Sequence, residues 1–203
     1  MKASLLELAE MAIIKLLGKD LISDLLPHQR SEPRGNYTNF ANKVIRPRST
    51  LEVSKVMSIL NEMSVKVIPY CGGTGLVGGQ IAPTTDYFLL SLDRMNSLRN
   101  ASISDKTLTV EAGMILSDVH NQAKRINRMF PLSLASEGTC QIGGNLATNA
   151  GGINVIKFGS ARSLCSGVEA VLADGKIYNG LSSLIKDNTG YDLRNLLIGS
   201  EGT

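Results

Sequence analysis

The feature that most constrains this chain is a glycine-rich stretch, VKVIPYCGGTGLVGG, at residues 65–79. Its first residues are β-branched and predict a short buried strand that ends at Pro69. Five of the eight residues 72–79 are glycine, which accepts positive φ and lets a ligand approach the main chain without meeting a Cβ. Successive peptides of this kind can turn their N–H groups toward one point and form an anion-binding nest. A simple turn needs one or two glycines rather than five, so the stretch predicts a phosphate site at the end of a strand.

Two common phosphate-binding motifs do not fit this stretch. A P-loop needs a lysine followed by Ser or Thr directly after its glycines, and no such pair is present here. Gly73, Gly75 and Gly78 match the dinucleotide fingerprint GxGxxG, but that fingerprint must open a helix whose N-terminus holds the pyrophosphate. Pro83 and the neighbouring threonines block a helix, and the next apolar run, YFLLSL at 87–92, predicts a strand. We therefore reject the Rossmann interpretation.

A second dense region, FPLSLASEGTCQIGGNLATNAGG at residues 130–152, combines glycines with small polar side chains. Such side chains can hydrogen-bond the edge of a ligand, while glycines let backbone N–H groups reach it. Glu137 is the only charged residue of the region, so we expect a neutral heteroaromatic ring and a polyol here rather than a second phosphate. A short helix over GGNLATNA is the expected local structure. A third glycine-rich segment, IGSEGT, lies at residues 198–203.

The N-terminal part of the chain predicts helices that face the core or a partner. Residues 4–17 are apolar at helical spacing, and the run DLISDLLP at 20–27 is expected to form a second amphipathic helix. Glu7, Glu10 and Lys15 interrupt the apolar core that a secretory signal requires. The segment is also too short and too charged to span a bilayer.

The middle of the chain predicts a βαβ unit in front of the glycine loop. It consists of a strand at 43–46, a helix from a capping box of Ser49 and Glu52 to about residue 61, and the strand at 65–68. The glycine loop then lies beyond the carboxyl end of a parallel strand, where such sheets commonly bind ligands. Further expected elements are strands at 87–92, 107–111, 167–173 and 176–179, a helix from Ser117 to Arg128, and a polar turn at 187–192.

Composition excludes several function classes. A chain of 203 residues can bury a core and makes about one domain or one and a half. The net charge of +3 is small and scattered, so nucleic-acid binding is not expected. Cys71, Cys140 and Cys165 lie far apart and form no CxxC motif, which favours a reducing cytoplasm over a disulfide scaffold. The two histidines, His28 and His120, have no ligand spacing, so no metal site is expected.

Four ordered motifs resemble one known family. Residues 69–79 resemble the pyrophosphate loop of the FAD-binding domain shared by vanillyl-alcohol oxidase and p-cresol methylhydroxylase relatives. EPRGNY at 32–37, the region 130–152 and KDNTGYDLRNLLIGSEGT at 186–203 resemble its branch of D-2-hydroxyacid dehydrogenases. That branch includes D-lactate and D-2-hydroxyglutarate dehydrogenases and the flavin subunit of glycolate oxidase. The resemblance covers roughly residue 32 to the end of the chain, and four motifs in order are far more specific than one.

The resemblance implies an α+β fold with a two-subdomain FAD-binding domain. A small βαβ-containing lobe at about 40–95 would be followed by a larger lobe of mixed β-sheet and helices at about 96–203. Residues 1–31 would form an N-terminal helical segment ahead of the FAD-binding domain at 32–203. Because domains end at exposed linkers and not within a glycine site that follows an apolar strand, we expect a C-terminally truncated, N-terminal piece of a longer protein.

The resemblance also implies noncovalent FAD. The loop at 69–76 would clasp the pyrophosphate chiefly through backbone N–H groups, residues 136–149 would line the isoalloxazine and ribityl chain, and residues 201–203 would close on the nucleotide. The expected cofactor-binding residues are Pro69, Cys71, Gly72, Gly73, Thr74, Gly75, Leu76, Ser136, Glu137, Gly138, Thr139, Cys140, Gln141, Gly143, Asn145, Thr148, Asn149, Gly151, Glu201, Gly202 and Thr203.

The implied activity is the oxidation of a D-2-hydroxy acid (D-lactate, D-2-hydroxyglutarate or glycolate) by hydride transfer to flavin N5. In the family the catalytic arginine and histidine and the metal site lie on a later substrate domain without counterpart here, so no catalytic residue is named. Another flavoenzyme of the same fold, such as an alkyl-dihydroxyacetone-phosphate synthase relative or a sugar-lactone oxidase, and a non-catalytic FAD-binding lobe are the alternatives. The expected partners are a small 2-hydroxy acid and an electron acceptor that the sequence does not identify, and a homodimer is left open. A cytoplasmic location is expected, or one peripheral to a membrane through the acceptor.

One departure from the family concerns the glycine loop itself. Tyr70 and Cys71 stand where relatives often carry Gln and Gly. A positive φ at Cys71 would cost on the order of 1 kcal/mol, so we predict a negative φ there. We expect Cys71 and Cys140 to be small buried residues rather than sites of covalent flavin attachment.

Overall fold

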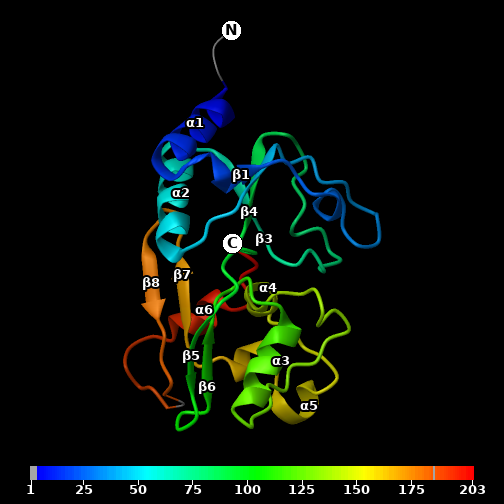
Figure 1. The fold of residues 1–203 in the computed structure, drawn as a ribbon, viewed down its shortest axis with the longest axis vertical. Helices are drawn as coiled ribbons and strands as arrows, with labels where there is room; N and C mark the ends of the chain where they lie inside the picture. The colour runs from blue at the N-terminus through cyan, green and yellow to red at the C-terminus, as the bar shows by residue number, and fades with distance from the viewer. Residues whose placement is uncertain (1–3, 185) are drawn as a thin grey trace. The chain divides into compact units, whose positions relative to one another are not determined.

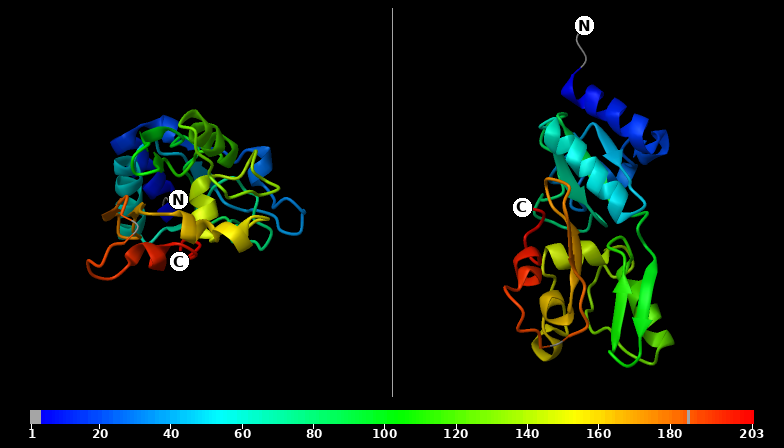
Figure 2. Two further views of the ribbon diagram at one scale, coloured as in Figure 1. Left: turned by 90° about the horizontal axis from the view of Figure 1, so that it is seen from below. Right: turned by 90° about the vertical axis from the view of Figure 1, so that its left-hand side faces the viewer.

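The computed structural model describes residues 4–184 and 186–203, whose course Figures 1 and 2 show. Helices are mixed with parallel and antiparallel strand pairs, so the fold is α+β as predicted. By packing, the chain separates into two compact units. The first holds the residues up to Arg94 together with Ala170–Tyr178, and the second holds Met95–Glu169 and Asn179–Thr203.

The first unit is built on a four-stranded sheet with the order β1-β2-β4-β3. β4 lies between β2 and β3, is parallel to both, and buries Phe88 and Leu89 completely. β3 is an edge strand whose side chains are mostly half-buried or exposed, so the prediction of a buried strand before the glycine loop is wrong. Pro69 fits there because an edge strand tolerates a missing N–H. The strands are β1 (Ile22–Ser23), β2 (Lys43–Ile45), β3 (Lys66–Tyr70) and β4 (Tyr87–Ser91).

Two helices of the first unit, α1 (Leu5–Leu17) and α2 (Thr50–Glu62), pack side by side, as Figure 2 shows. The side chains of Val56 and Leu60 on α2 are buried. Ser49 caps α2 as predicted, because its Oγ accepts the Glu52 N–H at 3.2 Å. The Glu52 carboxylate, however, accepts the N–H of Arg48 at 2.7 Å instead of closing a capping box. The predicted βαβ unit is present as β2, α2 and β3, and β4 lies between its two strands in the sheet.

The expected second helix at residues 20–27 is wrong. Gly18 ends α1 with φ +99°, and the chain then forms a short 3₁₀ turn, η1 (Lys19–Leu21). The next two residues form β1, which pairs antiparallel with β2. A second 3₁₀ turn follows as η2 (Pro27–Gln29). The apolar pattern of this run suits a helix or a strand, and backbone pairing with β2 decides in favour of the strand.

The second unit begins with an antiparallel pair, β5 (Leu98–Ser102) and β6 (Thr107–Val110). β5 was not predicted. Helix α3 (Leu116–Arg125) contacts β6 and buries Val119 and Ala123 as expected. Its N-cap is Ile115 rather than Ser117, and no side chain caps it, so the predicted cap is wrong by two residues. His120 is a packing residue, as predicted, because a ring nitrogen lies 2.8 Å from the Leu132 carbonyl oxygen.

The remaining elements of the second unit are short. The helix expected within the second glycine region is α4 (Ile142–Ala147). The apolar segment before the third glycine-rich segment, expected as a strand, forms the helix α6 (Leu193–Leu197). The hairpin of β7 and β8 turns at Gly175 as expected. The other elements are α5 (Val155–Phe158), η3 (Ala161–Leu164), β7 (Val168–Val171), β8 (Ile177–Gly180) and α6 (Leu193–Leu197).

The hairpin tip also changes the expected boundary between the two lobes. The sequence interpretation placed residues 96–203 together, whereas Ala170–Tyr178 packs with the first unit. The physical reason is a contact with α2, where the Ser54 hydroxyl donates to the Gly175 carbonyl at 2.6 Å. In the described part of the chain, no helix is both long enough and apolar enough to cross a bilayer.

Candidate functional site

The glycine loop leaves the carboxyl end of β3 and reaches β4 without forming a helix, as the rejection of a Rossmann motif requires. Its backbone N–H groups are the main feature. Among the described residues, none of the N–H groups of residues 72–79 donates a hydrogen bond. Cys71 has a negative φ as predicted, and the positive φ values fall on Gly73 (+68°) and Gly78 (+82°). A run of unsatisfied donors on glycine-rich backbone is the expected construction of an anion nest.

Carbonyl groups of the same loop accept hydrogen bonds from the two residues that follow it. The Gln80 side chain donates from Nε2 to the Gly75 carbonyl at 2.7 Å and lies 3.5 Å from the Gly73 carbonyl. The Ile81 N–H donates to the Gly78 carbonyl at 3.0 Å. Three carbonyl groups of the loop therefore accept hydrogen bonds from the residues that follow it, while its N–H groups stay available for a ligand.

Tyr70, the last residue of β3, packs against Gly73 of the loop. Its side chain is 3% exposed, its hydroxyl donates to the His28 carbonyl at 3.2 Å, and burial raises its pKa to about 12. A Cβ on Gly73 would lie 2.2 Å from this hydroxyl oxygen. Position 73 consequently accepts only glycine while Tyr70 keeps its place.

Two segments between β1 and β2 lie beside the glycine loop. The buried Asn39 accepts the N–H groups of Ala41 and Ala82 through Oδ1, at 3.2 and 3.1 Å, and so fixes the end of the loop. In the EPRGNY segment the buried Glu32 carboxylate accepts the N–H groups of Arg34 and Asn36, at 2.8 and 2.5 Å. The Tyr37 ring of that segment lies 3.7 Å from the position of a Cβ on Gly78.

In the second unit, the polar glycine region wraps around the start of α4. The Gly143 N–H donates to the Ala112 carbonyl at 2.8 Å, and a Cβ on Gly143 would lie 2.8 Å from the Ala112 Cβ. Gly152 is equally constrained, because a Cβ there would lie 2.1 Å from the Ser133 carbonyl oxygen. These glycines are thus needed for close packing, whereas Gly138 has no atom within 4 Å of its Cβ position and is open.

Two buried acceptors beside α4 have no partner in the described chain. They are Oε1 of Gln141, the N-cap residue, and Oδ1 of Asn145, and both side chains are more than nine-tenths buried. A buried polar atom without a hydrogen bond costs roughly 1–3 kcal/mol, so a bound group that donated to these two oxygens would be favoured here. The N–H and hydroxyl groups of a flavin ring and ribityl chain match these acceptors chemically.

The third glycine segment packs against the carboxyl end of α4. The N–H groups of Gly199 and Glu201 donate to the carbonyls of Leu146 and Ala147, each at 3.0 Å. Glu201 has φ +51°, and the Thr203 hydroxyl donates to the Ser200 carbonyl at 2.7 Å. The structure thus brings the second and third predicted stretches together within one unit.

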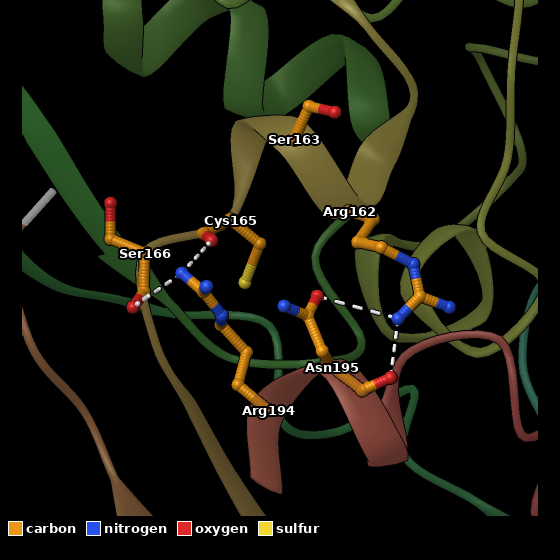
Figure 3. A pocket seen from close by; sticks show the side chains of 6 residues that line it. All are labelled: Arg162, Ser163, Cys165, Ser166, Arg194 and Asn195. Atoms are coloured by element: carbon orange, nitrogen blue, oxygen red, sulfur yellow. Dashed lines mark hydrogen bonds between the residues drawn. The ribbon is translucent and has the colours of Figure 1, made fainter. Parts of the chain in front are cut away.

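Two arginines hold this third segment, in an open pocket that Figure 3 shows. Arg162 donates to the Asn195 carbonyl and, at 2.5 Å, to the Ile198 carbonyl. Arg194 donates from Nη1 to the carbonyls of Cys165 and Ser166 at 2.8 and 3.2 Å. Burial raises the pKa of the Cys165 thiol, which therefore stays protonated at neutral pH. Both guanidinium groups donate to backbone carbonyls, and Arg194 also pairs with Asp192 at 2.7 Å, while its buried Nε has no hydrogen-bond partner in the described chain. These contacts stabilise the fold, and the sequence did not indicate them.

The predicted site residues occupy three local settings. In the first unit, Pro69 lies in β3 and residues 71–76 form the loop after it. In the second unit, residues 136–151 include α4, and residues 201–203 follow α6 and pack against α4. Cys140 is buried, as expected, whereas Cys71 is only half-buried. Sequence reasoning missed the supports of the glycine loop, namely Asn39, Tyr70 as a packing partner, and Gln80. Only Gln80 carried a signal, as a polar residue directly after the final glycine pair.

Sequence relatives of the chain are dehydrogenases. A probable mitochondrial D-2-hydroxyglutarate dehydrogenase of Oryza sativa subsp. indica is 42% identical over 169 residues, which cover 83% of this chain and 30% of that protein. A D-2-hydroxyglutarate dehydrogenase of Xanthomonas citri pv. viticola is 44% identical over 157 residues, covering 77% and 33%. A putative mitochondrial D-lactate dehydrogenase of Schizosaccharomyces pombe is 39% identical over 166 residues, covering 82% and 31%. The chain spans about a third of the length of these curated relatives.

The fold is shared with solved enzyme structures. An alkyldihydroxyacetonephosphate synthase structure matches 96% of this chain and 37% of its own, with a TM-score of 0.81 and 19% sequence identity. The family described as FAD binding domain matches residues 41–180, which is well over half of the chain. The resemblance seen in the four motifs is thereby confirmed, and this chain belongs to the FAD binding domain family.

Proposed function

We propose that this chain binds FAD noncovalently and forms the FAD-binding portion of an oxidoreductase that oxidises a D-2-hydroxy acid to the 2-oxo acid. The observation that carries the proposal is the run of unbonded N–H groups at residues 72–79, which suits a diphosphate. A bound flavin supplies the redox chemistry by accepting a hydride from the substrate. The protein supplies binding, orientation and electrostatics.

Each stretch has a distinct role in this proposal. Gly72, Gly73, Thr74, Gly75 and Leu76 hold the diphosphate through backbone N–H groups. In the second unit, Gln141 and Asn145 accept hydrogen bonds from the flavin ring or ribityl chain, which satisfies their two orphaned oxygens. The segment at 201–203 borders the nucleotide. No residue of this chain is assigned to proton transfer.

The substrate class is proposed from the relatives. Two of the relatives described above carry the name D-2-hydroxyglutarate dehydrogenase and one D-lactate dehydrogenase, so D-2-hydroxyglutarate is the first candidate, before D-lactate and glycolate. A reducing, cytoplasmic location is supported only by three free cysteines. The homodimer left open by the sequence stays a prediction, and no electron acceptor is proposed.

The experiment is a titration of the purified chain with FAD, followed by flavin fluorescence, with acid precipitation of the complex. We expect saturable binding and a colourless pellet, because no covalent attachment is proposed. Absence of binding contradicts the proposed cofactor, and a yellow pellet contradicts the noncovalent mode. For the reaction, full-length protein with a dye acceptor should reduce the dye with D-2-hydroxyglutarate faster than with glycolate. No turnover of any of the three acids would favour a non-catalytic FAD-binding lobe.

A further inference from the structure

The Gln80 carboxamide packs against the glycine loop and touches two of its peptide groups. Nε2 donates to the Gly75 carbonyl at 2.7 Å and approaches the Gly73 carbonyl at 3.5 Å. Oε1 lies 3.0 Å from the position of a Cβ on Gly75, so the side chain is packed directly against that residue. Nothing in the assigned roles of the loop uses Gln80.

The hydrogen bonds from Gln80 to these carbonyls determine where the neighbouring N–H groups point. All peptide bonds of the described chain are trans. In a trans peptide the C=O of one residue and the N–H of the next point in opposite directions. Binding of the Gly73 and Gly75 carbonyls by Gln80 therefore directs the N–H groups of Thr74 and Leu76 away from the Gln80 carboxamide.

Gln80 is itself held in place by the buried Asn39. The Asn39 Nδ2 lies 3.4 Å from the Gln80 carbonyl oxygen, and the Asn39 Oδ1 accepts the Ala82 N–H at 3.1 Å. The Phe40 N–H also donates to the Ala82 carbonyl at 3.0 Å. The carboxamide thus projects into the loop from a fixed piece of backbone, which glycine-rich residues 72–79 lack by themselves.

We propose that Gln80 is a positioning residue that holds the loop in its anion-binding form and aims the N–H groups of Thr74 and Leu76 at the cofactor diphosphate. This inference rests on the proposed FAD binding and deepens it. Gln80 makes no contact with the ligand in this role. It lowers the cost of ordering a flexible loop when the ligand binds.

The test compares Gln80→Met, which keeps the size of the side chain and removes its donor, with wild type. The ligands are FAD, ADP, which carries a diphosphate without a flavin, and riboflavin, which carries a flavin without a phosphate. We expect Gln80→Met to raise the dissociation constants of FAD and ADP about 10-fold, the upper range for the loss of one neutral hydrogen bond. Riboflavin affinity and the urea midpoint should be unchanged. Gln80→Glu should weaken FAD and ADP more, because a carboxylate beside a diphosphate adds repulsion.

Gln122→Leu is the matched control, since that glutamine lies on α3 and its side chain accepts a hydrogen bond from the Arg125 guanidinium at 3.1 Å. It should leave all three affinities unchanged. Unchanged FAD and ADP binding in Gln80→Met overturns this inference and leaves the proposed function intact. Equal weakening of riboflavin, or a lowered urea midpoint, also overturns it, because the residue would then have a general structural role. A wild-type chain that binds neither FAD nor ADP overturns both proposals.

Discussion

Substitution of Gly73 by alanine tests the packing beneath the glycine loop. The new Cβ would lie 2.2 Å from the Tyr70 hydroxyl oxygen and 2.9 Å from its Cζ, distances that real Cβ atoms do not reach. Tyr70 cannot move away cheaply, because it is buried and its hydroxyl donates to the His28 carbonyl. The left-handed φ of +68° costs a residue with a Cβ about 1–2 kcal/mol. The overlap adds about 1–3 kcal/mol, as overpacking of a filled site does.

Gly78→Ala is a control in the same loop. Gly78 also has a left-handed φ, +82°, but its Cβ would meet only the Tyr37 ring at an ordinary 3.7 Å. The difference between the two variants therefore isolates the overlap with Tyr70.

The assay is FAD affinity by quenching of flavin fluorescence, since the ligand-free loop can relax and FAD binding must restore it. Gly73→Ala should weaken FAD about 5- to 150-fold more than Gly78→Ala, which corresponds to the 1–3 kcal/mol of overlap. Tyr70→Leu combined with Gly73→Ala should recover most of this difference. Equal dissociation constants for the two alanine variants would refute the packing described here.

The other predictions concern stability. The folded state raises the Tyr70 pKa to about 12, above the value of about 10 in an unfolded chain, so the neutral phenol is favoured by folding. This contribution to stability should therefore be complete below pH 10 and be lost between pH 10 and 12, by up to about 1.4 kcal/mol per pH unit. Urea unfolding across this range should give a slope that is smaller by this amount in Tyr70→Phe, because the lysines with raised pKa values titrate in both proteins. Asn39→Leu leaves the N–H groups of Ala41 and Ala82 without an acceptor and should lower the free energy of unfolding by about 2–4 kcal/mol. Ser49→Ala removes the cap of α2 and should cost about 1 kcal/mol, measured as a lower thermal midpoint.

Local chemistry could be predicted from the sequence wherever a single residue type decides the structure. Five clustered glycines indicated a loop with exposed N–H groups, and Pro83 excluded a helix after it. Ser49 indicated the start of α2, and Asp174 with Gly175 indicated a hairpin turn. These signals act within a few residues, so the surrounding chain rarely overrides them.

The rest depends on contacts between residues far apart in the sequence. The insertion of β4 between β2 and β3 follows from which apolar strand is buried on both faces, not from chain order. The apolar run at 20–27 became a strand and two tight turns because β2 offered a free edge. The role of Gln80 requires Asn39, which lies 41 residues earlier. No local pattern carries such information.

The hairpin tip at Ala170–Tyr178 has a consequence for how the protein is made and cut. Gly175, with φ +85°, comes so close to α2 that a Cβ would lie 2.1 Å from the Ser58 hydroxyl oxygen, while Ser54 binds its carbonyl. During synthesis, more than a hundred residues must be added after α2 before the hairpin can cover the α2 surface around Ser54 and Ser58. A gene fragment that stops after Arg94 should accordingly yield an incomplete, aggregation-prone product, and a lobe meant for independent study needs the hairpin spliced back onto it.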